Sequence, residues 1–139
     1  MKPMNLASIM DEVAAVLAGV TGLRVHPQPV KALSPPAGVV GYPLGDGVTF
    51  HQTYREGEAS IADLPVHLVC QNITDRAALD TVAAWINRES ATSAVSVLEA
   101  HAWTSCDCVT VVNAEFSSLT VGTVDYLDVV LHLDITVSG

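Results

Sequence analysis

The stretch TVDYLDVVLHLDITV, residues 123–137, carries the strongest strand pattern in the chain and decides its fold. Apolar and polar side chains alternate along it, and a period of two places the apolar ones on one face of a sheet. The apolar face comprises Leu127, Val129, Leu131, Leu133, Ile135 and Val137. The opposite face comprises Asp128, His132, Asp134 and Thr136, with Val130 as the exception. The pattern predicts a strand with one buried face and one exposed, partly acidic face.

Four other segments have strand character. Residues 64–71 alternate in the same way, and residues 106–116 include three valines. Two shorter apolar segments, residues 23–26 and 37–42, are each followed by a proline, which cannot donate a hydrogen bond to a sheet. These segments predict two further long strands and two short ones.

Three segments have the spacing of helices. Residues 5–20 carry apolar side chains three and four positions apart, with Asn5 as the expected N-cap and Glu12 away from the apolar stripe. A second helix is expected from Thr74 or Asp75 to about residue 88, and a third over roughly residues 93–101. The stripe expected to be buried in the second helix comprises Leu79, Val82, Ala83 and Ile86.

The order of these elements is helix, two short strands, a long extended segment, strand, two helices and two strands. The long strands are separated by short turns or by helices that cannot reach both faces of a sheet. This order predicts an α+β fold, with a mostly antiparallel sheet and the helices packed on one face. The length of 139 residues corresponds to a single domain, residues 1–139.

Residues 43–63, here called the arm, lack a core pattern. Glycines and charged residues surround Val48, Phe50 and Tyr54, which is typical of an extended arm or a long hairpin. A segment of this length without a core pattern is commonly functional in a compact domain. Phe50, Tyr54 and Arg55 are residue types enriched at the centres of protein interfaces. The alternative is a solvated surface loop.

The excess of acidic over basic residues bears on which kind of molecule the protein binds. The chain has six Lys and Arg against 15 Asp and Glu, a net charge of -9, which disfavours direct recognition of nucleic acid. Hydrophobic residues make up 50% of the chain and charged residues only 15%, so we expect some apolar surface to meet a protein partner. Asp11 and Glu12 interrupt the first apolar segment, and no run is long enough to span a bilayer. We therefore expect neither a signal peptide nor a membrane partner.

Residue types that could ligate a metal cluster only at His101, Cys106 and Cys108. Both sulfurs would share one face of a strand, but zinc needs three or four ligands, and His101 would have to fold back across a turn. Buried, inert thiols are the ordinary alternative. The histidines are scattered, and the chain has neither a nucleophile motif nor a glycine-rich phosphate loop. We therefore expect no metal, no cofactor, no catalytic residues and no enzymatic activity.

The order of segments resembles that of the tail terminator proteins of long-tailed phages, especially phages of actinobacterial hosts. The likeness extends over nearly the whole chain and lies in structural rather than catalytic segments. These are VTGLRV (20–25), SPPAGVVG (34–41), the arm, LPVHLV (64–69), TDR (74–76) and VGTVDYL (121–127). The pair Cys106 and Cys108 is not part of the family pattern.

The resemblance implies a structural virion protein located at the tail–head junction and assembled in the host cytoplasm. Such proteins form a ring, usually of six subunits, on the last ring of the tail tube. The ring ends tube polymerisation and provides a docking surface for the head-side connector. The implied partners are further copies of the chain, the tail tube protein and the head–tail connector or stopper protein. DNA passes through the lumen without specific binding.

Two groups of site residues follow from this interpretation. Those expected to contact a neighbouring subunit or the tube are Val48, Phe50, Tyr54 and Arg55. Those expected to line the channel, where an acidic wall would repel DNA, are Asp125, Asp128 and Asp134. Two alternatives remain open. One is another phage neck protein, either a head-completion or connector protein or a tube-like subunit. The other is a small ligand-binding or hydrolytic domain that uses His101 and the cysteines.

Overall fold

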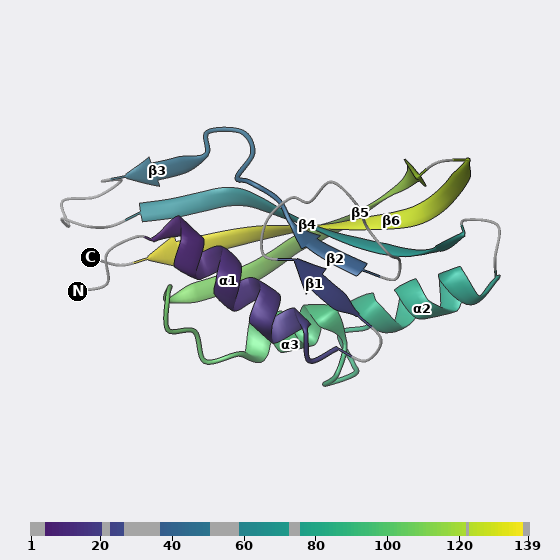
Figure 1. The fold of residues 1–139 in the computed structure, drawn as a ribbon. Coiled ribbons are helices and arrows are strands. Elements are labelled where there is room, and N and C mark those ends of the chain that lie inside the picture. Colours follow the sequence, from purple (N-terminus) through teal and green to yellow (C-terminus); the bar gives the residue numbers. More distant parts are fainter. Residues whose placement is uncertain are drawn as a thin grey trace.

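The computed structural model describes residues 5–20, 23–26, 37–50, 59–72, 76–121 and 123–137. The helices and strands, in chain order, are α1 (Leu6–Leu17), β1 (Arg24–His26), β2 (Ala37–Val40), β3 (Val48–Phe50), β4 (Ala59–Asn72), α2 (Arg76–Ile86), α3 (Ala94–Ala100), β5 (Cys108–Val121) and β6 (Val124–Val137). They form the predicted α+β fold, with a mixed, mostly antiparallel sheet. Figure 1 shows the three helices gathered on one side of that sheet.

Strands β4 and β6 form the centre of the sheet. The strand order is β1-β2-β4-β6-β5, and β3 pairs with the first residues of β4 along the edge that β2 also uses. Strands β1 and β2 run parallel, whereas each of the other pairs runs antiparallel. Strands β1 and β3 therefore lie toward one border of the sheet, and β5 forms the opposite border.

The alternation in residues 123–137 is confirmed. The helix-facing side chains of β6 that are completely buried are Val129, Leu131, Leu133, Ile135 and Val137. Leu127, near the hairpin turn, is half-buried against the same core. These side chains join residues of all three helices in one hydrophobic cluster. Burying a side chain such as Leu131 contributes about 2 kcal/mol, so this strand is a large part of what holds the helices to the sheet.

The first helix is confirmed together with its cap. The side-chain oxygen of Asn5 accepts a hydrogen bond from the backbone N–H of Ser8 at 3.1 Å, which satisfies a donor that the helix itself leaves unpaired. The buried face of α1 comprises Ile9, Met10, Val13, Ala14 and Leu17. The helix therefore follows from local sequence signals at both its start and its buried stripe.

The second helix is confirmed, but its predicted buried stripe is only half right: Val82 is buried and Ile86 is partly buried, whereas Leu79 and Ala83 are exposed. Ala78, Val82 and Trp85 are buried, whereas Leu79 is 52% exposed. Both sets have the spacing of one helical face, so periodicity alone could not separate them. The observed rotation buries the large ring of Trp85, which removes more apolar surface from water than a leucine would.

Two strand boundaries differ from the prediction. Strand β4 begins at Ala59 instead of residue 64, so the last part of the arm belongs to a strand that pairs with both β3 and β6. The hairpin expected within the arm is thus confirmed for Val48–Phe50 against Ala59–Ile61. Strand β5 begins at Cys108 and continues to Val121, because β6 provides a partner along that whole length. Small and polar residues hid these extensions, since pairing outweighs their weak strand propensity.

Candidate functional site

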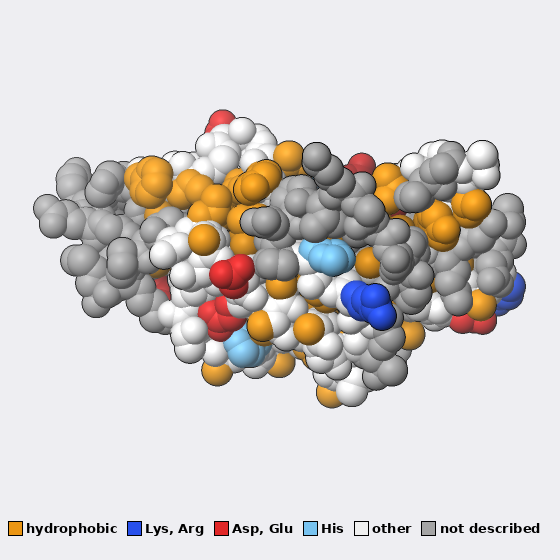
Figure 2. All heavy atoms as spheres, in the orientation of Figure 1, with side chains coloured by type: hydrophobic (Ala, Val, Ile, Leu, Met, Phe, Trp, Pro, Cys, Tyr) orange, Lys and Arg blue, Asp and Glu red, His pale blue; other side chains and the backbone are white. Residues whose placement is uncertain are grey.

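Three exposed apolar side chains lie where the arm leaves the sheet; we call Tyr42, Leu44 and Phe50 the β3 patch. Phe50 ends β3 with 57% of its surface exposed. The turn before β3 depends on Gly45 and Gly47, whose φ angles of 64° and 67° are unfavourable for residues with a Cβ. The backbone N–H of Gly47 donates to the carbonyl of Leu44 at 3.1 Å. Figure 2 shows hydrophobic side chains gathered along this border.

The four residues predicted for the arm contact differ in their surroundings. Val48 is half-buried against the hydrophobic core and so anchors β3 to the body of the protein. Phe50 lies two positions later on the same face of β3 but is largely exposed. Tyr54 and Arg55 lie outside the described residues. Val48 therefore has a structural role, and Phe50 is the candidate for contact with another molecule.

The three predicted channel residues do not share one surface. Asp134 is exposed on the side of the sheet opposite the helices. Asp125, an odd number of positions away, faces the other side and accepts a hydrogen bond from the hydroxyl of Thr120. Asp128 is only 5% exposed, and its Oδ2 lies 3.0 Å from Nδ1 of His67. The expectation of an exposed side chain at Asp128 is wrong, because this carboxylate is enclosed within the sheet surface.

His132 links three strands on the face opposite the helices. Its Nδ1 lies 2.6 Å from Oδ1 of Asp63 in β4, and its Nε2 lies 3.0 Å from Oε1 of Glu115 in β5. The hydrogen bond with Asp63 raises the pKa of His132, burial opposes it, and Glu115 raises it further. Both β4 and β5 have a register shift beside this group, so His132 ties together the two irregular parts of the sheet. The alternation of the strand predicted that His132 lies on the polar face. It did not predict that Asp63 and Glu115 lie on either side of the ring.

We expect His132→Gln to remove a pH dependence from the stability of the protein. The folded pKa of His132 is raised above 6.5, so its stabilising effect is fully present below pH 6.5 and is lost as the pH rises through the folded value. The difference in unfolding free energy between wild type and variant should therefore shrink as the pH rises above 6.5. Urea unfolding at a series of pH values measures it; a difference that grows over that range contradicts the ion-pair network.

A second polar network covers part of the border formed by β5. Glu99 of α3 accepts a hydrogen bond from the backbone N–H of Val111 at 3.2 Å, and Nη2 of Arg88 donates to the carbonyl of Val111 at 3.0 Å. Arg88 and Glu99 are themselves joined by a 2.8 Å ion pair. Side chains thus occupy the backbone groups that a neighbouring strand would need at this point of the edge.

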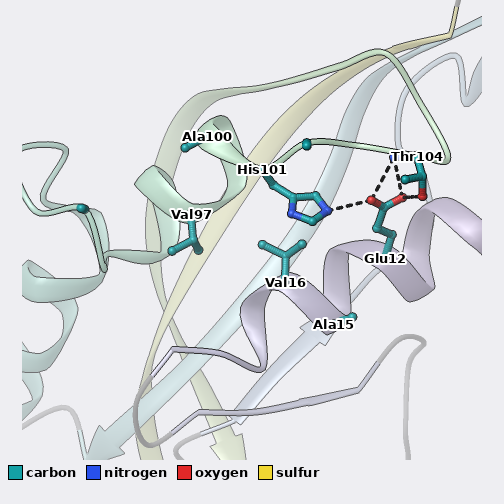
Figure 3. Close-up of a pocket in the computed structure, with 9 residues that line it drawn as sticks. Glu12, Ala15, Val16, Val97, Ala100, His101 and Thr104 are labelled. Carbon is teal, nitrogen blue, oxygen red and sulfur yellow. Dashed lines mark hydrogen bonds and ion pairs between the residues drawn. The ribbon is translucent and has the colours of Figure 1, made fainter.

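Glu12 ties α1 to the loop that follows α3. Its carboxylate accepts hydrogen bonds from the backbone N–H groups of Thr104 and Ser105, the shorter of these being 2.8 Å from Ser105. The hydroxyls of Thr104 and Ser105 also donate, at 3.1 and 2.6 Å, and Nε2 of His101 lies 2.8 Å away. Figure 3 shows His101 and Thr104 converging on the Glu12 carboxylate. Glu12 lies away from the apolar stripe, as expected. Its carboxylate is nevertheless hydrogen-bonded, and only 14% of its side chain is exposed.

The hydrogen bonds to the Glu12 carboxylate limit its use in acid–base chemistry. Burial alone would raise the pKa of Glu12, but hydrogen bonds from Ser105, Thr104 and His101 outweigh that effect and lower the pKa to about 2. A carboxylate with such a low pKa is a poor general base near neutral pH. The adjoining hollow of about 640 Å³ is lined largely by small apolar residues such as Ala15, Val16, Val97 and Ala100. The arrangement favours a structural clamp between α1 and the loop.

The expected geometry of the two neighbouring cysteines is wrong. Cys106 precedes β5 and is fully buried, whereas Cys108 is the first residue of β5 and is exposed. The two side chains therefore do not share a strand face, because only one of them belongs to the strand. Cys70 is also buried, with its sulfur 3.7 Å from the carbonyl oxygen of Ala78. Among the described residues, no group of three His, Cys, Asp or Glu side chains is placed to hold a metal ion.

Comparison with known protein families and with curated proteins gives no match for this chain. In the part of the chain that the structure describes, none of the helices combines the length and apolar character needed to cross a membrane. Function is therefore inferred from the surfaces described above and from the order of sequence segments.

Proposed function

We propose that this chain is a structural virion protein that assembles into a ring, six subunits by its resemblance to tail terminators, at the end of a phage tail tube. The ring ends tube polymerisation, and its other face docks the head-side connector. Its partners are copies of itself, the tail tube protein and the connector or stopper protein. It acts through self-association and shape, at the tail–head junction of the virion, and turns over no substrate.

The observation that best supports this proposal is the β3 patch. Tyr42, Leu44 and Phe50 place large apolar side chains in solvent at a border of the sheet, and they are three of the six large apolar side chains that are exposed among the described residues. Exposed apolar side chains that gather at one place are typical of surfaces that contact another protein. Two of its residues, Leu44 and Phe50, belong to the segment that the sequence singles out as an arm.

A ring of identical subunits imposes a geometric condition on that contact. Each subunit must present two different surfaces, and head-to-tail contacts close into a ring only when the rotation between neighbours divides a full turn. One face of the ring must match the tube subunit, and the other must not, since otherwise the tube would continue to grow. The net charge of -9, with Asp134 exposed on the face opposite the helices, suits a lumen through which DNA passes without binding.

The alternative of a hydrolytic or ligand-binding domain has less support. Its candidate residues were His101, Cys106 and Cys108, and the structure separates them: His101 pairs with Glu12, Cys106 is buried and Cys108 is exposed. The alternative of another neck protein differs from the terminator in where it binds. Binding at the ends of tail tubes, observed by electron microscopy, supports a terminator, whereas binding along tubes or to the head alone supports the alternative.

Deleting residues 46–58 is expected to abolish ring formation while leaving a folded subunit. The deletion removes β3, which among the described residues pairs only with Ala59–Ile61, so the other strands of the sheet keep their partners. Light scattering should show closed rings for the wild type and monomers for the deletion, with cooperative urea unfolding in both. A matched control is Thr81→Ala, on an exposed part of α2, which should leave the rings unchanged. Intact rings from the deletion contradict a role for the arm.

A further inference from the structure

The border of the sheet at β5 is only partly covered. Near its start, Arg88 and Glu99 occupy the backbone groups of Val111, but from residue 113 to residue 121 the described residues offer β5 no partner except β6. Phe116 lies in this open part and is 55% exposed. Figure 1 shows the closed end of the β5–β6 hairpin curling away from the helices. A stretch of strand edge and an aromatic ring are thus presented to solvent together.

This open edge lacks the usual protection against pairing with another strand. Proteins commonly place lysine, proline or several charges on an exposed strand edge to prevent association. Residues 113–121 contain neither lysine nor proline, and their only charged residue is Glu115, which is paired with His132 across the hairpin. An edge with a single charged residue and no lysine or proline is expected to be covered in the functional state of the protein.

The β3 patch at the opposite border has matching properties. Strand β3 pairs with β4 along one side, and residues 42–50 contain a single charge, Asp46. Residues paired across neighbouring strands lie on the same face of a sheet. Phe50 pairs with Ala59, and Ala59 pairs with Val137, whose side chain faces the helices. Phe116 pairs with Val129, whose side chain also faces the helices. When a sheet continues from one molecule into the next, residues on one face remain on one face. Both exposed phenylalanines would therefore lie on the same surface of a continuous sheet.

The small number of charges on both surfaces favours a second copy of the chain as the occupant, in spite of its net charge. Two subunits that each carry a net charge of -9 repel one another, so a stable contact between them must use surfaces with few charges. The β3 patch and the edge at residues 113–121 are two such surfaces, and they lie at opposite borders of one sheet. Because they lie toward opposite ends of the strands, the neighbouring subunit must be displaced along the strand direction, as in the staggered strands of closed barrels.

We propose that the β5 edge at residues 113–121, with Phe116 at its centre, docks against the β3 patch of a second copy of this chain. This inference rests on the proposed ring and identifies the second surface of its head-to-tail contact. Phe116 packs against the neighbour's β3 patch, and the two strand edges meet. The contact is heterologous: each copy binds one neighbour through its β5 edge and the other neighbour through its β3 patch. Contacts of this kind repeat from copy to copy until the ring closes.

The test uses two full-length variants, Phe50→Lys and Phe116→Lys, each of which places a charge in one of the two surfaces. Each variant alone is expected to be monomeric by sedimentation, with the subunit contact weakened about thirtyfold or more, the effect of losing a central interface residue. Mixed together, the variants should form one-to-one dimers but no rings, because each retains one intact surface. Leu79→Lys, the same type of substitution at another exposed apolar residue, should form normal rings.

The outcomes separate this inference from the proposed function. Rings that persist in Phe116→Lys, or two monomeric variants that fail to pair when mixed, overturn the contact while leaving the ring itself intact. A wild-type protein that stays monomeric at the highest soluble concentration overturns the ring and the contact together. Circular dichroism and urea unfolding establish that each variant is folded, so that loss of assembly is not mistaken for loss of structure.

Discussion

Replacing Glu12 with alanine is expected to lower the free energy of unfolding by about 3 kcal/mol, one of the largest effects of any polar substitution in this chain. The carboxylate accepts hydrogen bonds from two backbone N–H groups and two hydroxyls of the loop after α3, and His101 lies beside it. Removing it leaves partly buried donors at Ser105 without an acceptor, which costs more than the loss of an average hydrogen bond. Asp11→Ala, at the exposed neighbouring position, is the matched control and should change stability by less than about 0.5 kcal/mol.

The same residue predicts how stability changes with acid. The folded pKa of Glu12 is about 2, against an ordinary value of 4.5, so its contribution is present above pH 4.5 and is lost as the pH falls through the folded value. The difference corresponds to about 3 kcal/mol. Urea unfolding between pH 7 and acid should show this loss in the wild type and not in Glu12→Gln. Parallel curves for the two proteins contradict the clamp.

Leu131→Ala is expected to destabilise the protein by about 3 kcal/mol, within the range typical of leucine deletions in a packed core. Leu131 is completely buried in β6 and is paired with Val66 on one side and Ala114 on the other. Its removal leaves a cavity at the centre of the sheet, where the neighbouring strands cannot collapse easily. The midpoint of urea unfolding should fall while the denaturant dependence stays constant.

Leu79→Ala provides the comparison for that experiment. Leucine at this position of α2 is half exposed, so we expect a change below about 0.5 kcal/mol. Equal effects at Leu79 and Leu131 contradict the observed rotation of α2 and restore the buried stripe that its sequence first indicated.

Much of the fold could be predicted because its strongest signals are local. The alternation in residues 123–137 and the cap at Asn5 both depend on near neighbours in the sequence, and both are confirmed. The rotation of α2 could not be predicted, since the stripes that begin at Ala78 and at Leu79 each fit one helical face and share Val82, and only tertiary packing chooses between them. The early start of β4 at Ala59 likewise depends on partners supplied by other strands.

The polar clusters were less predictable than the fold, because each joins distant parts of the chain. Asp63, Glu115 and His132 come from three different strands, and their meeting depends on sheet register that no local pattern encodes. Glu12 and Ser105 are brought together by helix packing. For the arm, the sequence grouped Val48 with Phe50 and could not distinguish the anchoring of Val48 in the core from the exposure of Phe50.

The pairing of β4 with β6 has a kinetic consequence. Ala59 is paired with Val137, so the two central strands must find each other across a loop that includes two helices and another strand. Long-range pairing of this kind makes folding slow, on the order of milliseconds to seconds. The pairs β3–β4 and β5–β6 are closer in sequence, since each joins strands that follow one another along the chain. Local pairs of this kind form before the long-range one. Incomplete folding intermediates therefore expose the facing edges of β4 and β6, which are open to pairing with other chains until the two central strands meet.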